Sequence, residues 1–196
     1  MDRASPALNL SAPGAIDLLL TRRSGSAKAM TGPGPDADEL RTILTAAARV
    51  PDHGKLFPWR FILFEDEARA RFGGVLAECL PIEEASPERL AMERARFLRA
   101  PVIVGVVSRV REGIPIPVWE QELSAGAVCQ TMLIAATALG YVANWLTEWP
   151  AFNAKVGERL GLQGGERVAG FVYIGKPAQP LEERVRPELD KIVTRY

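Results

Sequence analysis

The stretch EQELSAGAVCQTMLIAATALG, Glu120 to Gly140, decides the fold of this chain. Its length predicts one helix of about 30 Å, and nearly every position from Leu123 to Leu139 is apolar or small. A helix that is apolar on all faces is buried on every side or lies in a membrane. The membrane alternative fits poorly, because polar residues interrupt the run and acidic residues flank it, namely Ser124, Gln130, Thr131, Glu120 and Glu122. We therefore predict a central helix that packs against a sheet, neighbouring helices and a second subunit.

The composition is that of a folded globular chain. Hydrophobic residues make up 47% of the 196 residues and charged residues 24%. Lys plus Arg and Asp plus Glu both number 24, and this balance argues against a protein that binds nucleic acid through bulk electrostatics. Two cysteines make no disulfide framework, and Cys129 in the apolar helix is most simply a small core residue. The N-terminus lacks the apolar segment of a secretion signal, so we expect the reducing cytoplasm.

The chain before the central helix predicts helices and two strands. Asp36 and Glu39 have the spacing of a capping box, and the amphipathic helix that they start ends before Pro51. The apolar run FILF within 60–65 indicates a buried strand. The run VIVGVV after Pro101 indicates a strand that is apolar on both faces and central in the sheet. Further helices are predicted at 15–22, 67–80 and 87–98, and a loop broken by prolines at 109–118.

The chain after the central helix predicts a strand at 141–146, a short helix and a last strand at 168–174. Asn153 can cap the short helix, and Gly161 can end it. Helices come first and strands are spread among them, which favours an α+β class over strict βαβ alternation.

The organisation is that of one domain spanning 1–196, because no repeat, low-complexity tract or linker divides the chain. Residues 1–13 are expected to form a loose N-terminal extension. The tail, 178–196, has too little apolar content to form a core, so it should lie over another surface.

Generic catalytic motifs are absent from the sequence. There is no phosphate-binding GxxxxGK[ST], no GxGxxG, no GxSxG and no paired histidines at metal-ligand spacing. His53 is the one histidine, and no obvious nucleophile accompanies it. If the protein is an enzyme, a cofactor is expected to carry the chemistry.

The first polar cluster is Arg22, Arg23 and Ser24 at a helix end. Two guanidinium forks and a hydroxyl suit a phosphate or a polyol. The alternative is structural, because basic residues near a helix C-terminus interact favourably with the helix dipole.

The second cluster, RVPDHGKLFPW from Arg49 to Trp59, is a cationic loop with aromatic residues. Such a loop can border a flat anionic ligand. The alternative is a surface loop with its aromatic side chains in the core, and we favour that interpretation for Trp59.

The third cluster is NWLTE, from Asn144 to Glu148, just past the predicted strand. Backbone amides in such a turn can face a ligand at the end of a strand. The alternative is an ordinary loop with two half-buried tryptophans, Trp145 and Trp149.

Taken together and in order, these motifs resemble a known family. The helix ending in RRS, the PDH loop leading to PW, the segment WEQELSAGAVCQTMLIAATALGY, ANWLT and GFVYIGKP look like the FMN-dependent nitroreductases, closest to the small NAD(P)H nitroreductases of bacteria. The resemblance covers roughly Ile16 to Pro177. It implies an α+β fold with a mixed sheet flanked by helices. It also implies an intertwined homodimer with FMN at the interface, in which the swapped C-terminal tail wraps the partner and adds a strand to its sheet.

The resemblance implies an FMN site that two subunits share. The contacts from one subunit are Arg22, Arg23 and Ser24, and those from the other are Arg49 and His53. The segment along the flavin ring, where a backbone amide faces the reactive nitrogen, is Trp145, Leu146 and Thr147.

Two further assignments come from the same resemblance. The stretch linked to the nicotinamide nucleotide is Ala135, Ala136, Thr137, Ala138, Leu139 and Gly140. Many members have a Lys where this chain has Ser26, and many have a basic pair in the tail that reaches the phosphate. Arg184 and Arg186 are the candidates for that pair.

The function implied is an FMN-dependent oxidoreductase that passes two electrons from NAD(P)H to a nitroaromatic, quinone or related flat acceptor by a ping-pong mechanism. Two alternatives stay open. One is a flavin enzyme of other chemistry, fragmenting flavin or removing halogens. The other is a flavin-binding protein without turnover. No nucleic acid, membrane or metal ion is expected as a partner.

Overall fold

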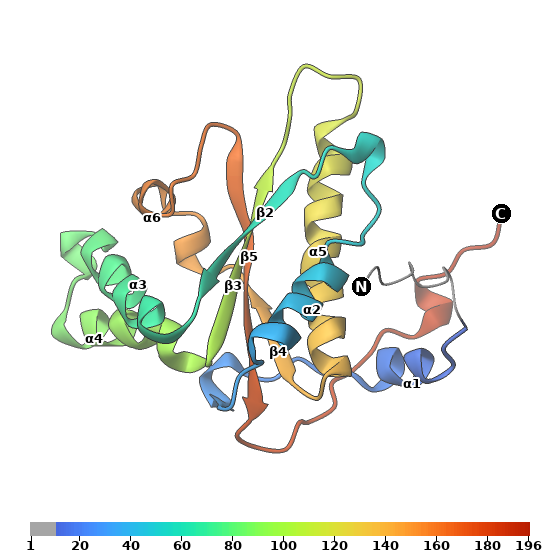
Figure 1. Ribbon diagram of the computed structural model, residues 1–196, viewed down its shortest axis with the longest axis horizontal. Coiled ribbons are helices and arrows are strands. Elements are labelled where there is room, and N and C mark those ends of the chain that lie inside the picture. Colours follow the sequence, from blue (N-terminus) through green and yellow to red (C-terminus); the bar gives the residue numbers. More distant parts are fainter. Residues whose placement is uncertain (1–10) are drawn as a thin grey trace, which may run out of the picture.

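The computed structural model describes residues 11–196, and it shows one sheet with helices on both faces (Figure 1). The first helix, α1, spans Gly14–Thr21 and follows a short loop. Most of the predicted N-terminal extension, residues 1–10, lies outside the described residues.

The sheet consists of β1 (Met30–Thr31), β2 (Trp59–Phe64), β3 (Val102–Arg109), β4 (Val142–Leu146) and β5 (Glu166–Pro177). β3 lies between β2 and β5, and β4 pairs with β5. The predicted α+β class is confirmed. The strand pairs within residues 11–196 are all antiparallel, whereas the resemblance implied a mixed sheet. Between β2 and β3 the chain passes through two helices and returns to the end of the sheet where β2 finishes. β3 therefore runs antiparallel to β2, and Phe64 pairs with Ile103.

Helices cover the two faces of the sheet differently. α2 (Ala37–Ala47) and α5 (Val118–Ala138) lie on one face, and α3 (Asp66–Cys79), α4 (Pro87–Ala95) and α6 (Ala154–Arg159) lie on the other (Figure 1). The side chains of β3 alternate between the two resulting cores. Val102, Val104 and Val106 pack with α2 and α5, while Ile103 packs with an aromatic cluster around Phe97. This alternation explains a strand that is apolar on both faces.

Several element boundaries follow local signals. The Asp36 side chain accepts from the amide of Glu39 at 2.8 Å, and the Glu39 carboxylate accepts from the amide of Asp36 at 3.0 Å, so the predicted capping box forms. Asn153 Oδ1 accepts from the amide of Val156 at 3.1 Å and starts α6 as predicted. The helix predicted at 87–98 ends as an α-helix at Ala95 and continues as a 3-10 turn, Arg96–Arg99.

Within one chain α5 is buried on one face only, and the predicted packing against a second subunit stays a prediction. Val128, Cys129 and Met132 are fully buried, and Cys129 is a core residue as predicted. On the opposite face, Trp119 is 66% exposed and Leu123 is 52% exposed. The physical reason is that the sheet and α2 cover only one face of α5. Among residues 11–196, no helix has the length and apolarity needed to cross a membrane.

The tail after β5 forms no core, as predicted. It contains one 3-10 turn, Leu189–Lys191, and its apolar side chains are exposed, with Val185 at 94%. The tail contacts the loop after α1, where Arg23 Nε donates to the backbone carbonyl of Glu182 at 2.7 Å. The dimer and the exchange of tails implied by the resemblance involve a second chain, so they stay predictions.

Candidate functional site

Three arginines gather where α1 ends and the tail passes. Arg22 Nη2 donates to Ser24 Oγ at 3.2 Å, and Arg186 of the tail lies close enough to affect Arg22. Burial lowers the pKa of the Arg22 guanidinium, and the positive charges of Arg186 and Arg23 lower it further. The structure therefore brings Arg22, Arg23 and Ser24 together with Arg186, one of the two tail residues selected from the sequence.

The arginine cluster contains a hydrogen-bond donor that has no partner within residues 11–196. Arg22 Nε is buried and has no hydrogen-bond partner among residues 11–196. Glu183 is the acidic neighbour, and its carboxylate lies 3.0 Å from Arg186 Nη2 and 3.6 Å from Arg23 Nε. Two guanidinium groups share this carboxylate and Arg22 adds a third positive charge, so an excess of positive charge remains, which an anion with several oxygens would balance. The cluster thus fits a phosphate group, and Ser26, in the place of a family Lys, is exposed beside it.

The edge strand β4 begins at this cluster. The side-chain amide of Asn144 donates to the backbone carbonyl of Gly25 at 2.6 Å. Any side chain at Gly25 would clash, because a Cβ there would lie 2.7 Å from Val142. β4 spans five residues, about 16 Å at the usual rise of a strand. Within residues 11–196, β4 pairs only with β5. The strand leads from the arginine cluster at its start to the turn at its C-terminal end.

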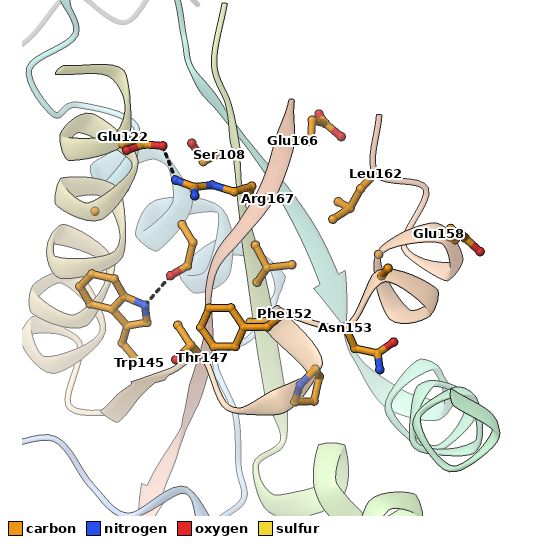
Figure 2. A pocket seen from close by; sticks show the side chains of 17 residues that line it. Ser108, Glu122, Trp145, Thr147, Phe152, Asn153, Glu158, Leu162, Glu166 and Arg167 are labelled. Carbon is orange, nitrogen blue, oxygen red and sulfur yellow. Dashed lines mark hydrogen bonds and ion pairs between the residues drawn. The ribbon is translucent and has the colours of Figure 1, made fainter. Parts of the chain in front are cut away.

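A cavity of about 760 Å³ opens at that C-terminal end (Figure 2). Figure 2 shows Trp145 on the α5 side, Leu162 on the α6 side, and Thr147 and Phe152 between them. Trp145 is held in place, since its Nε1 donates to the backbone carbonyl of Ala169 at 3.0 Å. These walls are mostly apolar, which suits a flat organic ligand.

Charged side chains line another part of this cavity. Glu122 of α5 forms an ion pair with Arg167 of β5 (Figure 2). Glu166 also lines the cavity, and its carboxylate lies 2.8 Å from the Arg60 guanidinium. The hydrogen bond from Arg60 is the main cause that lowers the pKa of Glu166, so this carboxyl is ionised at neutral pH.

The turn after β4 supplies free backbone donors beside the cavity. Among residues 11–196, the amides of Glu148 and Trp149 make no hydrogen bond. Their neighbours Thr147 and Pro150 both line the cavity. Glu148 has a φ of 49° and a ψ of −177°, a conformation that is essentially restricted to glycine. The third polar cluster therefore combines backbone donors that have no partner within residues 11–196 with an unusual backbone conformation.

His53 lies far from the arginine cluster in the same chain, and Arg49 precedes it in the loop after α2. His53 Nδ1 lies 2.7 Å from Glu120 Oε2, near the start of α5, whereas the loop after α1 lies near the other end of that helix (Figure 1). The 21 residues of α5 separate them by about 30 Å. One chain does not unite the two predicted halves of the site. In the same loop, Trp59 is in the core, as interpreted, and its Nε1 donates to Ser124 Oγ at 3.1 Å.

The stretch 135–140 forms the end of α5 and its cap. Ala136 is fully buried, and Thr137 Oγ1 donates to the carbonyl of Leu133 within the helix. Gly140, with a φ of 79°, lets the chain turn into β4. These roles account for the stretch structurally, and its contact with a nicotinamide nucleotide stays a prediction.

Sequence reasoning missed two residues that only the three-dimensional structure connects with the site. Phe152 of the cavity and Arg96, which pairs with Glu148, have no local motif around them. The signal for Asn144 and Glu148 was present, because both belong to the NWLTE cluster, yet neither was selected as a site residue.

Comparison with known proteins identifies the family of this chain. A model of the Nitroreductase family matches residues 19–176. The "Putative NAD(P)H nitroreductase YdjA" of Escherichia coli K12 is 37% identical over 167 residues, which are 83% of this chain and 88% of that protein. The "Putative NAD(P)H nitroreductase" of Haemophilus influenzae is 34% identical over 88% of this chain and 93% of its own length.

Solved structures share the fold. A nitroreductase-like family protein from Bacillus cereus superposes with a TM-score of 0.82 at 22% identity, covering 97% of this chain and 99% of that chain. A nitroreductase-family structure from Desulfovibrio desulfuricans, described as a complex with FMN, has a TM-score of 0.72 at 25% identity, covering 95% and 98%. This chain belongs to the Nitroreductase family.

Proposed function

We propose that this protein is an FMN-dependent oxidoreductase that passes two electrons from NAD(P)H to nitroaromatic, quinone or related acceptors. The observation that carries the proposal is the arrangement along β4. A cluster of arginines with an unpartnered donor lies at its start, and an apolar cavity with free amides lies at its end. The names of the two bacterial relatives and the FMN complex of the Desulfovibrio protein support the same cofactor and electron donor.

The residues of this chain fit the two ends of FMN. Arg22, Ser24 and Arg186 would hold the phosphate through charge-assisted hydrogen bonds. The segment Trp145–Thr147 would border the ring. When bound, FMN supplies the redox chemistry, taking two electrons from NAD(P)H and giving them to the acceptor. The protein contributes binding, orientation and exclusion of water.

NAD(P)H and the acceptor must both use the cavity beside the flavin ring, so we expect them to bind in turn. NAD(P)H presents a flat nicotinamide, the acceptor is also flat, and both must approach the same ring beside Trp145 and Phe152. We therefore propose a ping-pong mechanism. The charged pair Glu122–Arg167 at the cavity offers both signs of charge to the polar substituents of an acceptor.

A homodimer would complete the site. The uncovered face of α5, with Trp119 and Leu123, and the exposed apolar side chains of the tail both need a partner surface. His53, about 30 Å from Arg22 in one chain, would then belong to the neighbouring subunit's site, together with Arg49 of the same loop. Both cysteines are buried and unpaired, which suits the cytoplasm expected from the sequence.

The test begins with the absorption spectrum of the purified protein. We expect a yellow protein that releases FMN on denaturation. Initial rates of NAD(P)H oxidation with menadione or a simple nitroaromatic should give parallel double-reciprocal lines. A colourless protein that takes up no FMN would contradict the cofactor. Intersecting lines would contradict the single shared site, and bound FMN without turnover would favour a flavin-binding protein that is not a reductase.

A further inference from the structure

Glu148 adopts a backbone conformation that its own residue type does not favour. Its φ of 49° and ψ of −177° lie in a region that side chains disfavour and glycine tolerates. Such a conformation persists only when the surrounding structure holds it in place. Glu148 directly follows Thr147, at the end of the segment proposed to border the flavin ring, so the contacts that hold it bear on the site.

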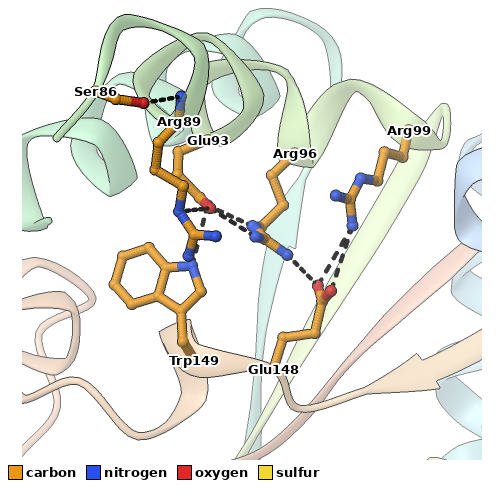
Figure 3. Close-up of polar contacts among 7 residues, drawn as sticks. All are labelled: Ser86, Arg89, Glu93, Arg96, Arg99, Glu148 and Trp149. Atoms are coloured by element: carbon orange, nitrogen blue, oxygen red, sulfur yellow. Dashed lines mark hydrogen bonds and ion pairs between the residues drawn. The ribbon is translucent and has the colours of Figure 1, made fainter. Parts of the chain in front are cut away.

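The side chains of Glu148 and of the next residue, Trp149, both make contacts that hold the turn in place (Figure 3). The Glu148 carboxylate lies 2.6 Å from Arg96 Nη1 and 3.4 Å from Arg99 Nη1. The next side chain is tied to the same place, since Trp149 Nε1 donates to Glu93 Oε2 at 3.0 Å. Figure 3 shows Arg96 between Glu93 and Glu148, so one guanidinium joins both anchors.

Arg96 and Glu93 form a rigid base for these anchors. The Arg96 side chain is 5% exposed, that of Glu93 is fully buried, and the two are joined by a bidentate pair with one bond of 2.6 Å. Burial alone would raise the pKa of Glu93, but hydrogen bonds and positive charge from Arg96 outweigh it and lower that pKa. Both groups are therefore charged at neutral pH, and a buried charged pair of this kind is costly to disturb.

The buried Arg96–Glu93 pair affects the backbone donors beside the cavity. The backbone amides of Glu148 and Trp149 make no hydrogen bond among residues 11–196, and the residues on either side of them line the cavity. The direction of the Trp149 N–H relative to the Glu148 N–H depends on the dihedral angles of Glu148. A residue that fixes these angles also fixes where the donors point.

We propose that Arg96 is a positioning residue, which acts through Glu148 to hold the amides of Glu148 and Trp149 in place for the flavin ring. The inference rests on the proposed function. Arg96 lies on the 3-10 turn after α4, on the face of the sheet opposite α5, so it reaches the flavin site through Glu148 and, by way of Glu93, through Trp149. Preorganised donors stabilise a ring that gains electrons, because they do not have to reorient when the charge develops.

Two substitutions at one position separate backbone geometry from the ion pairs. Glu148→Ala and Glu148→Gly both remove the carboxylate and therefore the same contacts with Arg96 and Arg99. Glycine can still adopt the conformation, whereas alanine is strained in it and should relax away. Glu67→Ala is the matched control, because it also removes a glutamate from an ion pair, at an exposed site on α3.

The experiment measures the FMN dissociation constant, the visible spectrum of bound FMN and its midpoint potential for each holoprotein. For Glu148→Ala we expect about tenfold weaker FMN binding, a changed spectrum and a more negative potential. For Glu148→Gly we expect values between those of Glu148→Ala and the wild type. The melting temperature should fall in both variants, because both lose the same ion pairs.

Three outcomes are decisive. A larger effect of alanine than of glycine on FMN supports the positioning role. An FMN affinity, spectrum and potential like those of the wild type in both variants overturn it while the wild type still binds FMN. Absence of FMN binding by the wild type itself overturns the proposed function, and with it this inference.

Discussion

The side-chain amide of Asn144 donates a hydrogen bond of 2.6 Å to the backbone carbonyl of Gly25, and so joins β4 to the loop after Arg22–Ser24. Gly25 approaches β4 closely enough that a Cβ would lie 2.7 Å from Val142. The arginine cluster therefore has a fixed place relative to the strand that leads to Thr147 and the cavity. A ligand that spans both ends meets two preset anchors.

Replacing Asn144 with alanine should loosen this connection. The carbonyl of Gly25 loses its donor, which typically costs about 1–3 kcal/mol for a buried group. We expect Asn144→Ala to weaken FMN binding about tenfold, since the phosphate cluster is no longer aligned with the strand. Titration of the apoprotein with FMN measures this change. Gln163→Ala is the control, because it also removes an amide-to-carbonyl bond, at an exposed turn; an equal effect in both variants would contradict the prediction.

The arginine cluster should dominate the affinity for FMN. Arg22→Ala removes a guanidinium with an unpartnered buried nitrogen, and the loss of one charge-assisted contact with phosphate costs about 1.5–3 kcal/mol. The FMN dissociation constant should rise roughly tenfold to over a hundredfold. Arg71→Ala removes an arginine from an exposed pair on α3 and should leave the constant unchanged. Equal constants for both variants would show that the cluster has only a structural role at a helix end.

The uncovered face of α5 should form the dimer interface. Leu123→Lys places a charge on this face, and burying an unpaired charge is strongly unfavourable. We expect light scattering at micromolar concentration to give 21.4 kDa, the mass of one chain, together with loss of bound FMN. Leu98→Lys changes the same residue type at nearly equal exposure, 50% against 52%, on the 3-10 turn after α4. If this control also dissociates, or if Leu123→Lys stays dimeric, the interface lies elsewhere.

The Arg60–Glu166 pair should make stability depend on pH in the acid range. The hydrogen bond from Arg60 lowers the pKa of Glu166 below its ordinary value of 4.5. A lowered folded-state pKa contributes stability that is complete above 4.5 and is lost as pH falls through the lowered value. Arg60→Met should therefore cost about 1–3 kcal/mol near pH 7, and the difference from the wild type should shrink below pH 4.5.

Urea unfolding at a series of pH values measures this difference. The control is Arg71→Met, whose exposed partner Glu67 should give less than about 1 kcal/mol at any pH. A destabilisation by Arg60→Met that is constant from pH 7 to pH 3 would show that packing of the arginine stem, rather than its charge, is what matters.

Much of the fold was predictable from short stretches of the chain. The capping box of Asp36 and Glu39 and the cap at Asn153 form because each joins groups only three residues apart. The strand after Pro101 was predictable because its apolar run matches burial on both faces. Arg22, Arg23, Ser24 and the NWLTE segment were found as polar clusters, and the resemblance joined them into one site.

The rest depends on contacts between residues far apart in the chain. Glu148 is held by Arg96, 52 positions away, and Asn144 by Gly25, 119 positions away, and nothing near either residue encodes its partner. The face of α5 that stays uncovered was also not predictable, since the helix is apolar all round and only packing selects the side that meets the sheet. Local hydrogen bonds and side-chain periodicity depend on residues close together in the chain, so the sequence determined the elements and the polar clusters. The distances between those clusters are set by how helices and strands pack, so only the tertiary structure decided which of them share a site.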